Sequence, residues 1–502
     1  MFRRVLIANR GEIAVRIIRA CHELGVEAVA VYSEADRDAL HARLADYAYE
    51  IGPAPAAQSY LRADAMLEAA RAAGAEAIHP GYGFLAENAG FAQACAAAGV
   101  VFVGPSPEAL ALMGDKLAAR KLAAQVGVLT APGTLEPVGD IDALAAAREI
   151  GFPLLIKAAA GGGGKGMRAV RSEEELITAL TQARSEASSS FGEGSVYLER
   201  LIERPRHIEV QLFGDGRGRV VHLGERECSI QRRYQKVVEE SPAPGLPTEV
   251  RARLWDSAVR LAAAAKYGGA GTIEFLHEPS SGECYFLEMN ARLQVEHPVT
   301  EQVTGVDLVQ AQLRLAAGES LDDVLGEYTV GGSAHAIEVR VSAEDPDGQW
   351  FPSTGTIQLL REPGGPGIRM DSACEPGLEV GVHYDPLLAK LIAWGRSREE
   401  AIGRLRRALD EYVLTGVRST LPFHRWLVRD ESFLGGDLST AFIAERWRPE
   451  ERAEPPPGVR GAAQAALMSQ IDEQRRRRQV TPVGGALSTS VWRSAGRTEG
   501  QR

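Results

Sequence analysis

Residues 285–296 read Tyr285-Phe286-Leu287-Glu288-Met289-Asn290-Ala291-Arg292-Leu293-Gln294-Val295-Glu296. If the chain stays extended here, a period of two places the polar side chains on one face and the apolar ones on the other. The polar members are Glu288, Asn290, Arg292, Gln294 and Glu296. An amphipathic strand that wets its polar face is the alternative, but such a strand favours mostly Thr, Lys, Ser and Glu. The stretch therefore predicts a functional polar ridge on a β-sheet.

The ridge begins with two oxygen donors, Glu288 and Asn290. Hard Mg²⁺ takes oxygen ligands and bridges phosphates, so both residues suit it. Glu274 interrupts the apolar strand predicted over 271–277, where a carboxylate needs a cation or an arginine. If the two strands are neighbours, Glu274 and Glu288 share one metal ion. Solvated or ion-paired carboxylates are the alternative interpretation.

Arg292 and Glu296 follow on the same face of the ridge. A guanidinium can hold bicarbonate through a bidentate fork. A neighbouring carboxylate can take the proton that bicarbonate must lose to become a good nucleophile. The ridge is therefore a candidate meeting place for a divalent cation and a one-carbon anion.

Four consecutive glycines occupy positions 161–164, followed by Lys165 and Gly166. Glycine permits a close approach of backbone N–H groups to anionic oxygens. The run is not a Walker A loop, which needs Ser or Thr after the lysine. Lys157 ends an apolar strand just before the glycines, which favours a phosphate-binding hairpin over a flexible surface turn. Lys116 is a second candidate cation.

Residues 228–240 are densely charged with both signs. A surface cluster of salt bridges is one interpretation. The apolar neighbours and the short spacing favour instead a loop that lines a polar site.

Short apolar runs alternate with alanine-rich helical stretches in the first third of the chain, which is typical of a parallel α/β sheet. The turn after the first strand is Asn9-Arg10-Gly11-Glu12 rather than G-x-G-x-x-G, so a nicotinamide-binding domain is disfavoured. A small lid is predicted around the glycine run. A larger α+β unit follows, from about His207 to Trp447.

The 502 residues are 45% hydrophobic and 25% charged, with a net charge of -11 at pH 7. This acidic balance counts against nucleic acid and anionic membrane as partners. No apolar run reaches the roughly 20 residues of a membrane span, and Val5–Ala8 is too short for a signal-peptide core. Five scattered cysteines fit a reducing, cytoplasmic setting. The arginines at 475–478 fit a solvated helix end better than a nucleic-acid patch.

Taken together, these motifs resemble the ATP-grasp superfamily and, within it, the biotin carboxylases. The resemblance is carried by IANRGEIA at 7–14, IHPGYGFL at 78–85, MGDK at 113–116, the glycine hairpin, QRR at 231–233, QKVVEE at 235–240, EMN at 288–290 and EHPVT at 296–300. It runs from residue 2 to about 446.

The resemblance implies an ATP-grasp fold with mixed α/β and α+β character. An N-terminal parallel-sheet domain is expected at 1–114, and the ATP-grasp region at 115–318, with its glycine-rich lid at about 132–203. The C-terminal biotin carboxylase domain is expected at 333–440, and a Pro-rich linker with a flexible tail at 448–502.

The resemblance also implies a role for each matching residue. The ATP phosphates would contact Lys116, Lys157, Gly163 and Gly164. The rest of the ATP pocket would comprise Glu199, Arg200, Leu201, Ile202, His207, Gln231, Tyr234, Glu274 and Glu288. Mg²⁺ or Mn²⁺ would bind Glu274, Glu288 and Asn290. Bicarbonate would bind Lys236, Arg292, Gln294 and the Val295 backbone, with Glu296 as its general base. Biotin would lie beside Tyr82 and Gly83, and Arg340 would stabilise its enolate-like form.

The implied enzyme is an ADP-forming C–N ligase. Bicarbonate attacks the γ-phosphate of ATP to give carboxyphosphate, which breaks down to CO₂ and phosphate. Phosphate removes the ureido proton of biotin, and biotin captures CO₂. No Ala-Met-Lys-Met motif occurs, so biotin is expected on a carrier protein that is another chain or lies beyond this one's end.

Carboxyltransferase subunits and a homodimer are the other partners that the resemblance implies. Acetyl-CoA carboxylase, and with it fatty acid biosynthesis, is the expected context. Propionyl-CoA, longer acyl-CoA and pyruvate carboxylases are alternatives.

Two departures from the family pattern stand in this sequence. Tyr234 replaces a histidine of many relatives, which puts one nucleotide contact in doubt, and Arg200 replaces a common lysine. Another ATP-grasp ligase is a rival interpretation, but such enzymes lack the Arg292-x-Gln294-x-Glu296 run. A non-catalytic nucleotide-binding protein is a second rival, and it predicts the loss of an essential group, whereas every candidate group is present.

Overall fold

The computed structural model describes residues 1–159, 167–451, 460, 461, 465 and 468. The main unit spans Met1–Pro455, and most of the second unit, Pro456–Arg502, lies outside the described residues. Gly163 and Gly164 also lie outside them, as do the Pro-rich segment at 454–458 and most of the predicted helix at 462–478.

The N-terminal part is a five-stranded parallel sheet in the order β3-β2-β1-β4-β5, as predicted for the first third of the chain. Its strands are β1 Arg4–Ile7, β2 Glu27–Tyr32, β3 Tyr47–Glu50, β4 Ala77–His79 and β5 Val101–Phe102. Its helices are α1 Gly11–Glu23, α2 Leu40–Leu44, α3 Ala63–Ala73 and α4 Ala89–Ala97. Helices cover both faces of the sheet, which is why its central strands are mostly apolar and buried.

A small antiparallel sheet forms the predicted lid, with the order β7-β6-β8. Its strands are β6 Leu154–Ala158, β7 Arg168–Val170 and β8 Val196–Arg200. Helices α7 Asp140–Ile150 and α8 Glu173–Phe191 pack on it around a small apolar core. Two further helices, α5 Pro107–Gly114 and α6 Lys116–Gln125, lead from the N-terminal sheet to the lid.

The centre of the main unit is an antiparallel sheet in the order β13-β12-β9-β10-β11-β14-β21-β19. Its strands are β9 Arg206–Asp215, β10 Val220–Arg232, β11 Gln235–Ser241, β12 Gly268–Glu278, β13 Glu283–Asn290, β14 His335–Ser342, β19 Ile368–Ser372 and β21 Leu387–Gly395. The β11–β14 pairing joins strands on either side of residue 333 into one continuous sheet.

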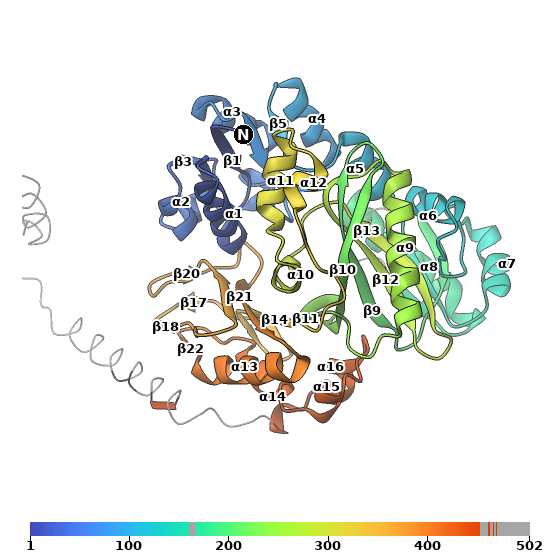
Figure 1. Cartoon of the computed structure of the whole chain (residues 1–502). Coiled ribbons are helices and arrows are strands. Elements are labelled where there is room, and N and C mark those ends of the chain that lie inside the picture. The colour runs from blue at the N-terminus through green and yellow to red at the C-terminus, as the bar shows by residue number, and fades with distance from the viewer. Residues whose placement is uncertain (160–166, 452–459, 462–464, 466–467, 469–502) are drawn as a thin grey trace, which may run out of the picture. The chain divides into compact units, whose positions relative to one another are not determined.

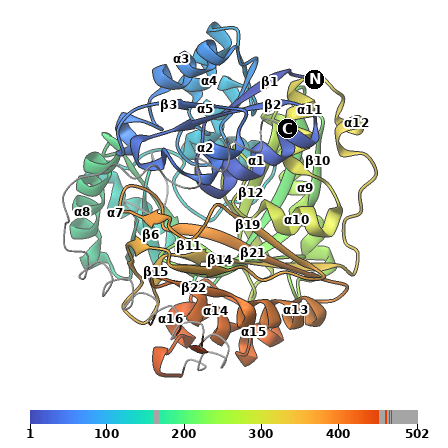
Figure 2. The ribbon, with the colours of Figure 1, turned by 90° about the vertical axis from the view of Figure 1, so that its left-hand side faces the viewer.

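Helices cover the large sheet, and α9 Thr248–Ala264 packs on β9 and β10. Helix α10 His297–Thr304 and helix α13 Arg398–Glu411 both pack on β14 and β21, α13 over the apolar core of that end. Figure 2 shows α13, α14, α15 and α16 together below these strands. The remaining helices are α11 Leu308–Ala316, α12 Leu321–Leu325, α14 Leu421–Leu427, α15 Glu431–Gly435 and α16 Phe442–Arg446.

Three short strand pairs complete the C-terminal part. They are β15 Glu344–Asp345 with β16 Phe351–Pro352, β17 Gly355–Thr356 with β20 Glu379–Val380, and β18 Leu359–Arg361 with β22 Val413–Thr415.

The charged segment 228–240 is a β-hairpin, so its prediction as a loop is wrong. Strands β10 and β11 pair antiparallel through it, and Arg233 and Tyr234 form the turn with φ of 48° and 67°. Two consecutive positive φ angles suit a tight two-residue connection between twisted strands. The segment still lines the cleft described below, as predicted.

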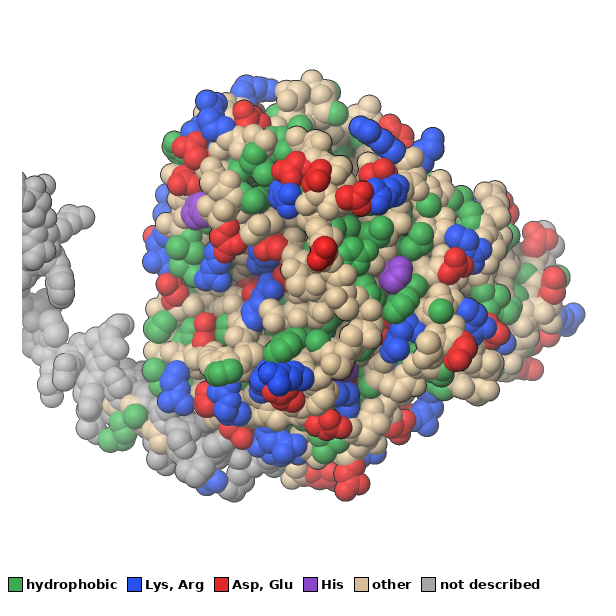
Figure 3. Space-filling view, in the orientation of Figure 1, with side chains coloured by type: hydrophobic (Ala, Val, Ile, Leu, Met, Phe, Trp, Pro, Cys, Tyr) green, Lys and Arg blue, Asp and Glu red, His purple; other side chains and the backbone are tan. Residues whose placement is uncertain are grey.

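Positive and negative side chains are interspersed over the face of the molecule seen in Figure 3. Within the described ranges, none of the helices combines the length and the apolarity that crossing a membrane requires.

Candidate active site

A single cleft of about 1030 Å³ gathers the predicted site residues from the N-terminal sheet, the lid and the large sheet. Every predicted site residue that the structure describes lines this cleft. They are Tyr82, Gly83, Lys116, Lys157, Glu199, Arg200, Leu201, Ile202, His207, Gln231, Tyr234, Lys236, Glu274, Glu288, Asn290, Arg292, Gln294, Val295, Glu296 and Arg340. Side chains from distant parts of the sequence therefore share one space.

Strands β12 and β13 are neighbours, and their register places Glu274 opposite Glu288 and Thr272 opposite Asn290. The Asn290 side-chain amide donates to Glu274 Oε1 at 2.8 Å. A bulge beside Glu274 also turns Leu287 toward the cleft. The strand ends at Asn290, so the predicted extended run fails beyond that residue, although Arg292, Gln294 and Glu296 still reach the cleft from the following turn.

The two facing carboxylates differ in protonation behaviour. Burial, followed by the negative charge of Glu274, raises the pKa of Glu288. Burial also opposes ionisation of Glu274, but Lys236 and His207 hold its pKa far below the usual value. Among the described residues, the side-chain carboxylate of Glu288 has no hydrogen-bond or ion-pair partner. A pair of facing carboxylates, one of them unpartnered, with an amide oxygen beside them fits a hard divalent cation.

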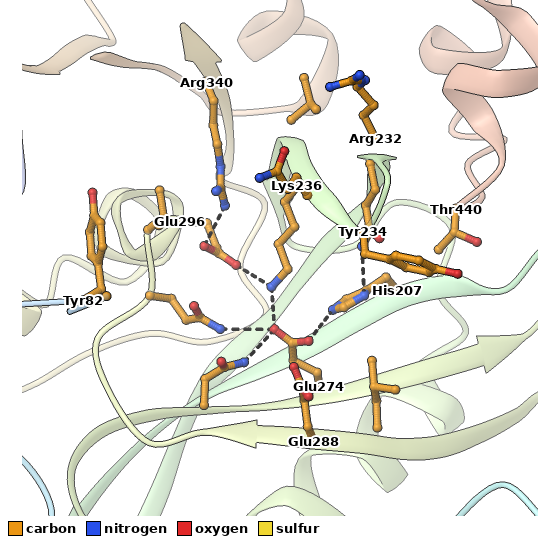
Figure 4. A pocket seen from close by; sticks show the side chains of 18 of the residues that line it. Tyr82, His207, Arg232, Tyr234, Lys236, Glu274, Glu288, Glu296, Arg340 and Thr440 are labelled. Carbon is orange, nitrogen blue, oxygen red and sulfur yellow. Dashed lines mark hydrogen bonds and ion pairs between the residues drawn. The ribbon is translucent and has the colours of Figure 1, made fainter. Parts of the chain in front are cut away.

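Lys236 is the centre of charge in the cleft (Figure 4). Its Nζ lies 2.6 Å from Glu274 Oε1 and 2.6 Å from Glu296 Oε1, and it also donates to Glu209 Oε2. Burial lowers the pKa of Lys236, but the three carboxylates more than offset this and hold the pKa well above its ordinary value. The side chain is therefore a fixed ammonium.

Glu296 receives a cation on each oxygen. Lys236 contacts Oε1, and Arg340 Nη2 donates to Oε2 at 3.0 Å. Burial alone would raise the pKa of Glu296, but Lys236 and Arg340 hold it well below the usual range. Arg340 is itself oriented by Glu239, to which its Nε donates at 2.6 Å. The carboxylate is thus held in its ionised form.

Arg292 lies across the cleft and is held by three side chains. Its Nη1 donates to Gln294 Oε1 at 2.6 Å and its Nη2 to Asn290 Oδ1 at 2.9 Å. Its Nε donates to Glu87 Oε2 at 3.0 Å. The guanidinium thereby links the oxygen donors of β13 to the turn that carries Glu296.

The lid side of the cleft holds two lysines. Lys157 on β6 is buried and donates to Glu199 Oε2 at 3.1 Å, and Glu199 is also bonded by the buried Arg120. Lys116 begins α6, where Asp115 caps the helix. Burial lowers the pKa of Lys116, and Glu288 partly offsets this. Lys116 and Lys157 thus both line the space between the lid and β13, where a polyanion could contact both ammonium groups.

His207 and Gln231 form a polar pair on β9 and β10. Gln231 Nε2 lies 2.9 Å from His207 Nδ1, and His207 Nε2 lies 3.1 Å from Glu274 Oε2. His207, Glu209 and Glu274 offer donor atoms within 4.8 Å of one another. Lys236 already bonds both of these carboxylates, so an ammonium is the cation at that position.

Tyr82 and Gly83 lie in the loop after β4 on the opposite wall. Asn9 donates to the carbonyl oxygens of Pro80 and Tyr82, both at 2.7 Å, and so fixes this loop. The Tyr82 hydroxyl donates to Glu12. By contrast, Tyr234 lines the cleft with 60% of its surface exposed at the hairpin turn.

The prediction from sequence missed several charged groups that hold this site, namely Glu12, Glu87, Glu209, Arg226, Glu239 and Lys390. Arg226 and Glu209 are fully buried partners at 2.5 Å. A usable signal was the alternation of His207, Glu209 and Gln211 with the apolar residues of β9, because charge at alternate positions of a buried strand requires partners.

Three protein-family models match successive parts of this chain. Residues 1–110 match the model of the biotin carboxylase N-terminal domain, and residues 338–445 match that of the biotin carboxylase C-terminal domain. Residues 115–324 match the ATP binding domain of the carbamoyl-phosphate synthase L chain. The chain belongs to the biotin carboxylase family. Biotin carboxylases are ATP-dependent ligases, and the predicted ATP-grasp fold with its N-terminal parallel sheet is confirmed.

Individual biotin carboxylases match over most of their length. Biotin carboxylase 1 of Bacillus subtilis is 50% identical over 444 residues, which cover 88% of this chain and 98% of that protein. A pyruvate carboxylase subunit of Methanothermobacter thermautotrophicus is 51% identical over 446 residues, which cover 89% of this chain and 90% of that protein.

Solved structures of biotin carboxylases match as well. The Campylobacter jejuni biotin carboxylase-β-γ-ATP complex superposes with a TM-score of 0.86 at 44% identity, covering 89% of this chain and 99% of that one. The biotin carboxylase domain dimer of Hydrogenobacter thermophilus 2-oxoglutarate carboxylase, with MgADP, ADP and bicarbonate, has a TM-score of 0.86 at 46% identity. That match covers 90% of this chain and 100% of the other.

Proposed function

We propose that this protein uses MgATP and bicarbonate to carboxylate biotin on a carrier protein, as the first half-reaction of an acyl-CoA carboxylase. One observation carries the proposal. The carboxylate of Glu296 is held ionised between Lys236 and Arg340, next to the facing pair Glu274 and Glu288. This arrangement supports the presence of a proton acceptor, anion-binding cations and metal donors in one cleft.

We assign each residue a proposed role according to its position in the cleft. Glu274, Glu288 and Asn290 would hold Mg²⁺ or Mn²⁺, which supplies charge neutralisation for the transferring phosphoryl group. Lys116 and Lys157 bind the phosphates of ATP, together with the glycines of the lid. The adenosine lies against residues 199–202, His207 and Gln231.

Bicarbonate binds between Lys236 and Arg292, with Gln294 and the Val295 backbone beside it. Glu296 takes its proton, the freed oxygen bonds to the γ-phosphorus, and the bond from that phosphorus to ADP breaks. Carboxyphosphate then releases CO₂ and phosphate. Phosphate takes the ureido proton of biotin, whose nitrogen bonds to CO₂ while Arg340 stabilises the enolate-like form beside Tyr82 and Gly83.

The assembly and setting are also proposed. A biotin carrier protein, carboxyltransferase subunits and a homodimer are the partners, and the dimer formed by the Hydrogenobacter biotin carboxylase domain supports the last. The domains divide at 1–114, 115–318 and 333–440, with a linker and tail at 448–502. Five unpaired cysteines support a cytoplasmic setting.

Acetyl-CoA is the proposed final acceptor, because chains named simply biotin carboxylase are among the relatives. Pyruvate is a second candidate, favoured by the 51% identity to the pyruvate carboxylase subunit of Methanothermobacter. Reconstitution with each candidate carrier and transferase distinguishes them by the product, malonyl-CoA or oxaloacetate.

The test of the core function is transfer of label from ¹⁴C-bicarbonate to biotin. We expect labelled carboxybiotin only when ATP and Mg²⁺ are present, and ADP release that biotin stimulates. Glu296→Gln is the matched inactive control. If biotin neither acquires label nor stimulates ADP release, the proposed function is wrong.

A further inference from the structure

Lys390 is a fully buried lysine in the middle of β21. Its Nζ donates to the carbonyl oxygen of Val295 at 2.8 Å. The same atom lies 3.3 Å from Glu12 Oε1 and 3.8 Å from Asp371 Oδ2. Lys390 is not among the residues that line the cleft. A lysine in such a place needs an explanation, because isolated buried ammonium groups are strongly disfavoured.

The surroundings of Lys390 keep it charged. Burial lowers the pKa of the ammonium, but Glu12, Glu338 and Asp371 more than offset this, so the pKa is raised. Glu338 is completely buried, and both of its carboxylate oxygens lack a hydrogen-bond partner within the described part of the chain. Arg369 also faces the group and pairs with Asp371 at 2.8 Å. The lysine is therefore the local counter-charge of a carboxylate-rich pocket.

The bond to Val295 acts on a critical piece of main chain. The Val295 carbonyl belongs to the peptide that leads into Glu296, and the Val295 N–H is the group proposed to bind bicarbonate. A charge-assisted hydrogen bond to this carbonyl restricts the orientation of both neighbouring peptide planes. The position of Glu296 relative to Lys236 and Arg340 depends on the same turn.

The contact with Glu12 reaches the opposite wall of the cleft. Glu12 lies in the first turn of α1 and accepts a hydrogen bond from the hydroxyl of Tyr82. The Lys390 ammonium thus contacts Val295, in the turn that carries Glu296, and also Glu12. Glu12 in turn orients Tyr82 on the proposed biotin side.

We propose that Lys390 is a positioning residue, which holds the bicarbonate-binding turn and the Tyr82 wall in a fixed relation through Val295 and Glu12. This inference rests on the proposed function. It predicts that removal of the ammonium weakens the use of bicarbonate while the ATP side of the cleft, formed by the lid and β13, is unaffected.

The test compares bicarbonate-dependent ADP release, without and with biotin, for the wild type, Lys390→Met and Lys390→Met/Glu12→Gln. The double variant removes one positive and one negative charge, so it protects the fold. Lys121→Met is the matched control, because Lys121 is exposed and pairs only with Glu136 in the described structure. We expect KM for bicarbonate to rise at least tenfold in both Lys390 variants, KM for ATP to change less than twofold, and the control to match the wild type.

Three results would overturn the inference. One is an unchanged KM for bicarbonate in folded Lys390→Met. Another is an equal rise in both KM values, which indicates a general loss of structure. The third is failure of both Lys390 variants to fold, which would assign the lysine to stability alone. A wild type without bicarbonate-dependent ADP release would refute the proposed function itself, and this is seen before any variant is compared.

Discussion

Glu296 shows how strongly single residues in this cleft depend on their neighbours. Its two oxygens are each bonded by a different cation, and those cations come from β11 and β14. A glutamate in water titrates near pH 4.3, whereas this carboxylate, with its lowered pKa, is ionised well below that value. The carboxylate is therefore ionised throughout the neutral range.

Replacing Glu296 by Gln removes the proposed proton acceptor but keeps the size of the side chain. We expect bicarbonate-dependent ADP release to fall by about 10²–10⁴-fold, the usual contribution of a general base. ATP binding, measured by equilibrium titration with MgATP, is expected to stay within a factor of about three. A variant with normal turnover would contradict the role assigned to Glu296.

Glu288→Gln addresses the metal donors. The substitution removes the charge of a proposed metal ligand whose pKa is raised by burial and by the neighbouring charge of Glu274. We expect the concentration of Mg²⁺ or Mn²⁺ needed for half-maximal activity to rise at least tenfold, as titration of EDTA-treated protein would show. An unchanged metal requirement would exclude Glu288 as a ligand.

Glu288 and Asn290 could be predicted as neighbours because their spacing follows the period of a strand. Arg292, Gln294 and Glu296 share the same spacing in the sequence, but they reach the cleft from the turn after β13. Lys390 and Glu87 could not be predicted, since each acts on the site from a distant segment and neither belongs to a local pattern. The tertiary fold decides which charged side chains pair across the cleft. A single sequence does not show these pairings directly.

At the scale of elements, the Glu240 carboxylate joins β11, β14 and α13. It lies 2.7 Å from His335 Nε2 and 2.7 Å from Arg398 Nε. Burial alone would raise the pKa of Glu240, but Arg398 and His335 lower it to about 2. A folded pKa below the unfolded value stabilises the protein above about pH 4.5, and this stabilisation is lost as the pH falls toward 2.

Glu240→Gln is therefore expected to lower the free energy of unfolding by about 3 kcal/mol at pH 7, the equivalent of a shift of two to three pH units. The difference from the wild type should shrink as the pH is lowered from 5 toward 2. Urea denaturation at several pH values measures it. Glu411→Gln in α13, the helix that carries Arg398, is the control, because its exposed pair with Arg407 is worth only about 0.2–0.5 kcal/mol. A difference that is independent of pH would contradict the linkage.

Leu405 tests the packing of α13 on the end of the large sheet. It is fully buried in the apolar core shared with β14 and β21. Leu405→Ala should cost about 2–5 kcal/mol of stability, as expected for a buried cavity. Differential scanning calorimetry is the measurement, and Ile177→Ala, at a position 55% exposed, is the neutral comparison. Equal melting temperatures for the two variants would show that this core is not tightly packed.

The elements themselves were predictable where the pattern was strong. The alternation of short apolar runs with helical stretches predicted the N-terminal parallel sheet, which the structure contains. Strand β3 was missed because Tyr47–Glu50 is mostly exposed and lacks an apolar run. The hairpin over 228–240 could not be predicted, because the dense charge of this segment obscures the alternating pattern of its two strands.

At the scale of the molecule, the described residues that line the cleft all lie between Asn9 and Thr440. We expect a chain ending at Pro455, the last residue of the main unit, to retain at least half of the wild-type ADP release. The comparison uses equal concentrations of folded protein. Loss of activity on truncation would assign a catalytic contribution to residues 456–502.

The pairing of β11 with β14 has a consequence for synthesis on the ribosome. The strand that brings Arg340 to Glu296 is translated long after its partner in the sheet, and the last wall of the cleft follows later still. The ion pairs that Glu239 and Glu296 make with Arg340 therefore form only after β14 has been synthesised. Until then both carboxylates lack one of the cations that surround them in the complete cleft.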